Sequence, residues 1–190
     1  MNNRRSFIVG IKSIRLSNKE KFFLKKYKPW GVILFTRNIA SIKQTLNLTS
    51  SIRKIFNDKR YPILVDQEGG RVNRLKKIIS FDNLTSEFFG NKFTSNFKEF
   101  IFFYKLFIDK TSYLLKSIGI NINTSPVLDL RIKGTSNIIG DRSYSKDPKI
   151  VSKIGDYCIE YFHKNGIGTV IKHIPGHGLA KVDSHNFTPV

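Results

Sequence analysis

The sequence is poor in cysteine and in acidic residues. Its single cysteine, Cys158, excludes an intrachain disulfide, so the fold cannot depend on such a cross-link. A reducing compartment suits such a chain, and we expect a cytoplasmic protein. Only 14 Asp and Glu stand against 33 Lys and Arg, which gives a formal net charge of +19. Such an excess can attract anionic partners, including nucleic acid.

The positive charge has no nucleic-acid recognition motif beside it. Basic residues are scattered among many Asn, Ile and Phe, as in the segment 19–28. This mixture indicates a compositional drift of the whole sequence rather than a dedicated binding surface. We therefore expect no specific nucleic-acid partner, and a basic nucleic-acid-binding protein stays an alternative interpretation.

Long uninterrupted hydrophobic runs are also absent. The apolar run 7–11 is too short for the hydrophobic region of a signal peptide. The segment 97–120 is very apolar, but charged residues interrupt it, whereas a membrane-spanning helix needs about 20 mainly apolar residues. We expect a buried helix there and no membrane partner. The interrupting residues are Lys98, Glu99, Lys105, Asp109 and Lys110.

Five short apolar runs have the character of buried strands. They are nearly continuous in apolar residues, as parallel strands covered on both faces are. With 40% hydrophobic residues and 16 Phe, the chain can form a sizeable single core. The predicted strands are 7–11, 31–35, 61–66, 121–128 and 168–174.

Helical patterns lie between these runs. Apolar residues recur with a period near 3.6 over 42–56, and a longer helix is expected over 97–118. Asp147 and Pro148 are typical of a helix start, and the pair 165–166 (Asn-Gly) is typical of a helix end. Cys158 falls on the apolar face of this last helix, so we expect a core thiol rather than a nucleophile.

The alternation of strands and helices predicts an α/β fold with a parallel sheet. A doubly wound sheet would suit 190 residues. A (β/α)8 barrel needs about 250 residues, so only about five of its units would be present. No Gly-x-Gly-x-x-Gly or P-loop follows any predicted strand, which disfavours a nucleotide-binding sheet. Polar clusters follow the third, fourth and fifth strands, where a barrel carries its catalytic loops.

Charged residues surround a Gly pair after the third predicted strand, in the sequence Asp-Gln-Glu-Gly-Gly-Arg-Val-Asn-Arg over 66–74. Asp66 is suited to accept hydrogen bonds from sugar hydroxyls, and Arg74 to hold an oxygen-rich group. The alternative is a structural ion-pair network in a tight turn. After the fourth strand, Asp141-Arg142 is a weaker signal, and taken alone it favours a loop salt bridge.

A cluster of titratable residues follows the fifth predicted strand, in the segment 172–185. It allows three interpretations. The first is a metal site, although the spacing matches no compact zinc pattern. The second is a set of structural histidines in a Gly-Pro loop. The third is acid/base machinery, in which Asp183 orients the imidazole of His185. The metal interpretation uses His173, His177, Asp183 and His185.

Five segments together resemble the bacterial cytoplasmic β-N-acetylhexosaminidases of glycoside hydrolase family 3. They are 31–38, 66–72, 125–129 (Ser-Pro-Val-Leu-Asp), 139–143 (Ile-Gly-Asp-Arg-Ser) and the loop 172–185. They occur in the family's order and span nearly the whole chain. The resemblance implies a (β/α)8 barrel, of which 1–190 would be the N-terminal part of a single catalytic domain, with about the first five βα units.

The resemblance also implies a reaction. It is the removal of terminal β-linked N-acetylglucosamine from peptidoglycan fragments in cell-wall recycling, with retention of configuration and without a metal or organic cofactor. The substrate would be a muropeptide containing N-acetylglucosamine. The implied general acid/base is His185, with Asp183 as its partner. The implied sugar-binding residues are Asp66, Arg74, Arg142, Lys172 and His173.

One element of the family's site is not found. The family's nucleophile is an aspartate on a later strand, beyond the Asp-Ser-His of 183–185. We therefore expect the C-terminal units to be absent from this chain, and a complementing C-terminal fragment is a possible partner. A catalytically inactive sugar-binding remnant or half of a split enzyme are the alternatives.

Overall fold

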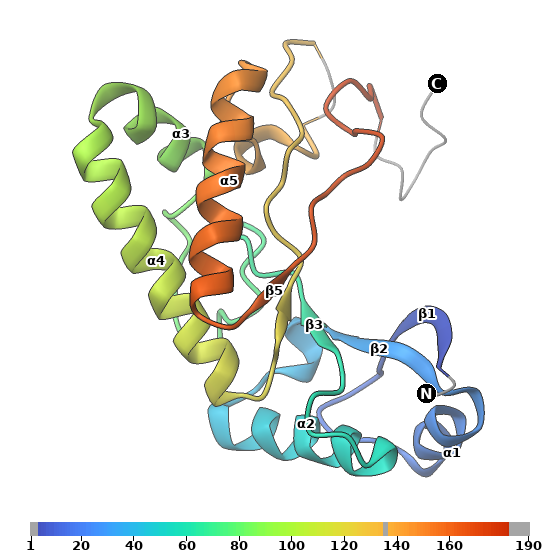
Figure 1. Ribbon diagram of the computed structural model, residues 1–190. Coiled ribbons are helices and arrows are strands. Elements are labelled where there is room, and N and C mark those ends of the chain that lie inside the picture. Colours follow the sequence, from blue (N-terminus) through green and yellow to red (C-terminus); the bar gives the residue numbers. More distant parts are fainter. Residues whose placement is uncertain (1–3, 135–136, 183–190) are drawn as a thin grey trace.

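The computed structural model describes residues 4–134 and 137–182, which form one parallel sheet with helices against it (Figure 1). The strand order is β1-β2-β3-β4-β5, and every neighbouring pair is parallel. Strand order that follows chain order excludes the doubly wound sheet, whose order reverses at a switch point. The strands are β1 (Arg5–Gly10), β2 (Pro29–Leu34), β3 (Ile63–Val65), β4 (Ile122–Asn123) and β5 (Gly168–Thr169).

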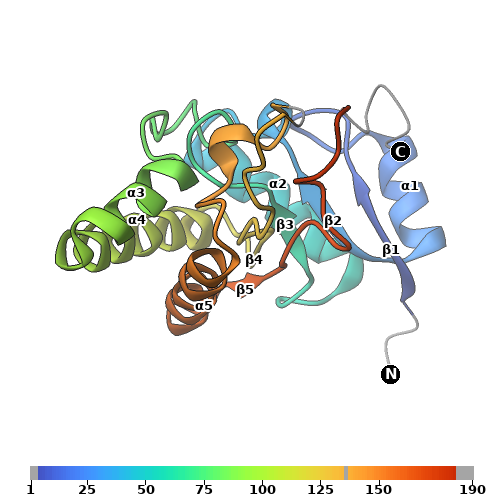
Figure 2. The same ribbon diagram turned by 90° about the horizontal axis from the view of Figure 1, so that it is seen from above.

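Helices connect each strand to the next. Viewed from above, the strands fan through an arc and the helices lie along its outer side (Figure 2). Short 3-10 helices, η1 (Thr36–Asn38) and η2 (Gly140–Arg142), lie in the loops that follow β2 and β4. The α-helices are α1 (Asn18–Tyr27), α2 (Ile42–Phe56), α3 (Ser86–Ser95), α4 (Phe97–Ser117) and α5 (Pro148–Lys164).

The predicted helices are confirmed closely, because their ends carry local capping signals. The predicted range 42–56 is the observed α2, whose first turn is capped by the Ser41 hydroxyl. At α5, the Asp147 side chain accepts a hydrogen bond from the backbone N–H of Lys149, and Asn165 ends the helix. No helix within 4–134 and 137–182 is long and apolar enough to cross a bilayer.

The last three predicted strands are longer than the observed ones. Asn123, the last residue of β4, adds side-chain bonds to the chain beyond β3: its Oδ1 accepts from the backbone N–H of Gln67 at 3.0 Å, and its Nδ2 donates to the Gln67 carbonyl oxygen at 2.9 Å. Pairing resumes only at an isolated bridge between Val127 and Lys172. Pro126 in the gap has no N–H to donate. The apolar runs therefore continue as loops beyond the carboxyl end of the sheet.

The core lies between the sheet and the helices. Fully buried side chains from β2, β3, α4 and α5 meet there, among them Leu34, Val65 and Phe100. Cys158 is buried in the same layer, as its helical spacing predicts. Burial raises the pKa of its thiol to about 12. At neutral pH Cys158 is therefore a protonated core side chain.

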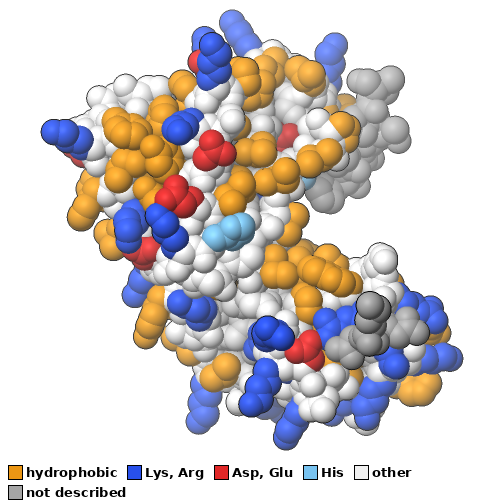
Figure 3. Space-filling view, in the orientation of Figure 1, with side chains coloured by type: hydrophobic (Ala, Val, Ile, Leu, Met, Phe, Trp, Pro, Cys, Tyr) orange, Lys and Arg blue, Asp and Glu red, His pale blue; other side chains and the backbone are white. Residues whose placement is uncertain are grey.

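The two edges of the sheet are β1 and β5, and within the described ranges neither has a further strand beside it. Large apolar side chains near these edges are exposed, including Ile8 on β1 and Ile171 after β5. The space-filling view shows the molecule deeply hollowed between β1 and the segment that follows β5 (Figure 3). An open arc with apolar residues at both edges is what part of a barrel presents.

Candidate active site

Three loops meet at the carboxyl end of the sheet. They follow β3, β4 and β5, and parallel strands place their carboxyl ends at one edge. The loop after β3 carries Asp66, the loop after β4 carries Arg142, and the segment after β5 carries Lys172. The structure brings these three predicted sugar-binding residues into one ion-pair network.

Lys172 is at the centre of the network. Its Nζ lies 2.9 Å from Oδ1 of Asp66 and 2.5 Å from Oε1 of Glu68. The Thr124 hydroxyl donates a hydrogen bond to Asp66 and lies 3.3 Å from Nζ of Lys172. Arg74 is more peripheral, with Nη2 3.8 Å from Oδ2 of Asp66. The side chain of Asp66 is 23% exposed, so part of its carboxylate faces solvent.

Arg142 joins the network through Glu68. Its Nε donates to Oε2 of Glu68 at 2.8 Å, and its Nη2 donates to Oε1 at 3.0 Å. Two parallel bonds of this kind fix both the position and the plane of a guanidinium. The side chain of Glu68 is only 3% exposed. Sequence reasoning gave Glu68 no role; the available signal was a second acid two residues after Asp66, directly before the Gly pair.

The Gly pair makes the turn that holds Glu68. Gly69 has φ +94°, and a Cβ there would lie 2.2 Å from the carbonyl oxygen of Leu84, so no larger residue fits. After the turn, Arg71 donates to the carbonyl oxygens of Asn137 at 2.7 Å and Ile139 at 2.9 Å. The turn therefore also holds the loop that carries Arg142.

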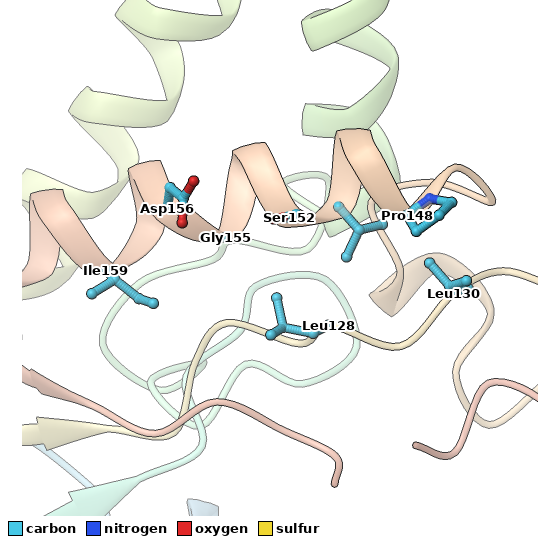
Figure 4. Close-up of a pocket in the computed structure, with 8 residues that line it drawn as sticks. Leu128, Leu130, Pro148, Ser152, Gly155, Asp156 and Ile159 are labelled. Carbon is cyan, nitrogen blue, oxygen red and sulfur yellow. The ribbon is translucent and has the colours of Figure 1, made fainter. Parts of the chain in front are cut away.

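A second buried carboxylate, Asp129, holds the loop after β5. It lies between Leu128 and Leu130, whose side chains line an apolar groove against α5 (Figure 4). Asp129 itself faces the segment 173–177 and accepts hydrogen bonds from the backbone N–H groups of His173, at 3.2 Å, and His177, at 2.5 Å. Nδ1 of His173 also lies 2.5 Å from its carboxylate. Sequence reasoning gave Asp129 no role beyond its place in a motif.

The acids of the site are ionised at neutral pH. Burial raises the pKa of Asp66, but the charge of Lys172 and the Thr124 hydrogen bond outweigh it, so the pKa lies below its ordinary value. For Glu68 burial likewise raises the pKa, and the bonds from Arg142 and the charge of Lys172 lower it further than burial raises it. Burial lowers the pKa of Arg142, and its bond to Glu68 raises it above the ordinary value.

The structure places the remaining predicted residues as follows. His173 lies on the loop after β5, half-buried against Asp129, with its ring 6.0 Å from that of His177. Asp183 and His185, predicted as the catalytic pair, lie outside the described residues. In the part of the chain that the structure describes, no group of three or more His, Cys, Asp or Glu could hold a metal ion.

The arrangement suits a neutral ligand with many hydroxyls. Asp66 offers partly exposed acceptor oxygens, and Lys172, Arg142 and Arg74 offer donors at the same edge. Sugar hydroxyls both donate and accept, so they can bond both kinds of group. The arrangement can therefore bind and orient such a ligand.

Comparisons with known proteins identify the family that the sequence motifs resemble. A family model described as the glycosyl hydrolase family 3 N-terminal domain matches residues 7–190. A β-hexosaminidase of Hydrogenovibrio crunogenus is 36% identical over 178 residues, which cover 94% of this chain and 49% of the relative. One of Thioalkalivibrio sulfidiphilus is 31% identical, covering 96% and 52%. The chain spans about half the length of the curated relatives that it matches.

Solved structures confirm the predicted fold class. NagZ from Neisseria gonorrhoeae superposes with a TM-score of 0.82 at 28% identity, covering 98% of this chain and 54% of that one. The same protein in complex with N-trifluoroacetyl-D-glucosamine gives the same TM-score at 29% identity and the same coverage. The sheet of consecutive parallel βα units is thus that of a (β/α)8 barrel, as the motif order implies.

Proposed function

Because the chain belongs to glycosyl hydrolase family 3, whose N-terminal domain model matches residues 7–190, we propose that it carries the sugar-binding part of a β-N-acetylhexosaminidase active site. Residues 1–190 would be the N-terminal part of a single catalytic barrel. The observation that carries the proposal is Lys172, which lies within bonding distance of both Asp66 and Glu68 at the carboxyl end of the sheet.

The proposed substrate is a terminal, non-reducing N-acetyl-β-D-glucosaminide, on a peptidoglycan fragment in cell-wall recycling. Support comes from the solved relative that binds N-trifluoroacetyl-D-glucosamine. Asp66 would accept hydrogen bonds from the sugar hydroxyls, while Arg142 and Lys172 would donate to its oxygens. Arg74 and His173 would complete the sugar contacts from either side. The cytoplasm is the proposed location.

The proposed chemistry is retaining hydrolysis. His185, assisted by Asp183, would protonate the glycosidic oxygen as a carboxylate attacks the anomeric carbon. Water would then hydrolyse the glycosyl-enzyme, with His185 accepting its proton. The attacking aspartate would come from the βα units that complete the barrel. Those units would pair with the open edges of β1 and β5, whether a complementing C-terminal fragment or a longer chain supplies them.

Binding tests the sugar site directly. Fluorine NMR would follow N-trifluoroacetyl-D-glucosamine with the 190-residue chain and with Lys172→Met. We expect the variant to lose roughly tenfold or more in affinity, because a part-buried charged donor is removed from the network. Lys164→Met, an exposed lysine on α5, is the matched control and should bind as the parent does. A parent chain that binds no sugar would overturn the proposal.

Turnover separates the enzyme from an inactive sugar-binding remnant. The chain is incubated with a chromogenic β-N-acetylglucosaminide, alone and with the C-terminal half of a β-hexosaminidase relative. Release of the chromophore only in the mixture would support a complemented catalytic barrel. Sugar binding without release in either case would favour the remnant. Steeply salt-dependent binding to DNA would instead favour the nucleic-acid alternative.

A further inference from the structure

We propose that Glu68 is a positioning residue of the sugar site: its buried carboxylate holds Arg142 and Lys172 in their binding arrangement without contacting the sugar. The inference rests on the sugar site proposed above and adds a residue to the predicted sugar-binding set without placing it against the sugar. It follows from the geometry of three loops that meet at one carboxylate.

Both oxygens of Glu68 are engaged. Oε2 accepts from Nε of Arg142 at 2.8 Å, and Oε1 accepts from Nη2 of Arg142 at 3.0 Å and lies 2.5 Å from Nζ of Lys172. The two cations come from the loops after β4 and β5, and Glu68 comes from the turn after β3. A single carboxylate thus ties together three segments that are far apart in the sequence.

The exposed fraction of its side chain distinguishes Glu68 from Asp66, the acid proposed to contact the sugar. The Glu68 side chain is 3% exposed, whereas Asp66, Arg142 and Lys172 are 23%, 14% and 12% exposed. A sugar at the carboxyl end of the sheet can therefore reach Asp66 and the outer faces of the two cations. It cannot reach Glu68 behind them. Glu68 acts on the ligand only through Arg142 and Lys172.

The two cations depend on Glu68 to different extents. Lys172 keeps a second carboxylate, Asp66, at 2.9 Å. Within residues 4–134 and 137–182, the Arg142 side chain otherwise donates to the carbonyl oxygen of Ile138, at 3.2 Å. Loss of the Glu68 charge would leave the Arg142 side chain less firmly held and Lys172 drawn more strongly to Asp66. That shift would also occupy acceptor capacity of Asp66 that the sugar hydroxyls need.

The first test is sugar affinity in Glu68→Gln, which keeps the side-chain shape and removes its charge. Fluorine NMR with N-trifluoroacetyl-D-glucosamine should show affinity reduced roughly tenfold or more, because two part-buried cations lose their common anion. Glu68→Asp keeps the charge on a shorter stem and should bind better than Glu68→Gln. Glu160→Gln, an exposed ion-paired acid on α5, is the matched control and should bind as the parent chain does.

A double-mutant cycle shows whether Glu68 acts through Arg142. If it does, Glu68→Gln should cost less affinity in the Arg142→Met background than in the parent chain, because the part of its effect that passes through Arg142 is already gone. Fully additive losses with Arg142→Met, and likewise with Lys172→Met, would mean that Glu68 acts through neither cation and would overturn the assignment.

The second test needs no ligand. In nitrogen-labelled protein, the heteronuclear NOE of the Arg142 Nε–Hε group reports the order of the guanidinium. We expect a rigid signal in the parent chain, and a mobile one in Glu68→Gln. If Glu68→Gln does not fold, Glu68→Asp gives the same readout, with intermediate order expected. Unchanged order together with unchanged affinity would overturn the positioning role. A parent chain with rigid Arg142 that binds no sugar would instead overturn the proposed function.

Discussion

The carboxylate of Asp129 holds His173 at two atoms, accepting from its backbone N–H at 3.2 Å and lying 2.5 Å from its ring Nδ1. Burial raises the pKa of Asp129, but these bonds and the one from the backbone of His177 lower it below the ordinary value. An ionised carboxylate only accepts, so Nδ1 of His173 carries the proton.

Asp129→Asn should loosen the loop after β5. The asparagine side chain keeps one acceptor oxygen. Its NH2 group is a donor, however, and would face an N–H group of the loop, which also donates. We expect the free energy of unfolding to fall by about 3 kcal/mol, since a buried, multiply bonded carboxylate is lost. Urea unfolding measures the loss, and ring nitrogen shifts of His173 report its tautomer.

Asp156→Asn provides the control for that variant. Asp156 is an exposed carboxylate on α5, so its replacement should leave both the unfolding midpoint and the His173 tautomer unchanged. Equal stability of Asp129→Asn and the parent would show that the loop does not depend on this carboxylate.

The chain should lose stability in acid through its site carboxylates. Asp66, Glu68 and Asp129 all have folded pKa values below their ordinary values of 3.8, 4.5 and 3.8. The unfolded chain then takes up these protons at higher pH than the folded chain. Their stabilisation is complete above the ordinary values and is lost as pH falls through them towards the folded values.

Denaturant unfolding at a series of pH values measures this loss. The free energy of unfolding should decline as pH falls below the Glu68 value of 4.5, and Glu68→Gln should decline less steeply. Parallel slopes for the two proteins would contradict the assigned contribution of Glu68.

The sequence predicts helices and site-bearing loops better than it predicts site contacts. The sequence predicts helix α2 at its observed bounds because apolar spacing is a local signal. Strands β4 and β5 are shorter than the apolar runs that predicted them, because side chains and Pro126 interrupt the ladder. The link from Glu68 to Arg142 spans 74 residues, and no local pattern specifies it. Motifs could therefore indicate Asp66 and Lys172, but they could not indicate that Glu68 joins the loops of this site.

Cys158 should be unreactive in the folded chain. Its thiol is buried beside the Tyr104 and Tyr144 hydroxyls, and burial raises its pKa to about 12. Because thiolate is the reactive form, an aromatic disulfide reagent should label the native protein slowly and the urea-unfolded protein fast, at about pH 8. Rapid labelling of native protein would show that the Cys158 face of α5 is not packed against the core.

Gly90→Ala should disturb the loop that carries Arg142. Gly90 lies on α3 against the loop after β4, and a Cβ there would be 1.7 Å from the carbonyl oxygen of Tyr144. Backbone must move to relieve this contact, which costs about 1–3 kcal/mol or more in stability. Tyr144 is two residues after Arg142, so sugar affinity should also fall. Asn91→Ala changes the next residue of α3, which is exposed, and should leave both the thermal midpoint and the affinity unchanged. A Gly90→Ala chain as stable as Asn91→Ala would mean that α3 does not pack against this loop so closely.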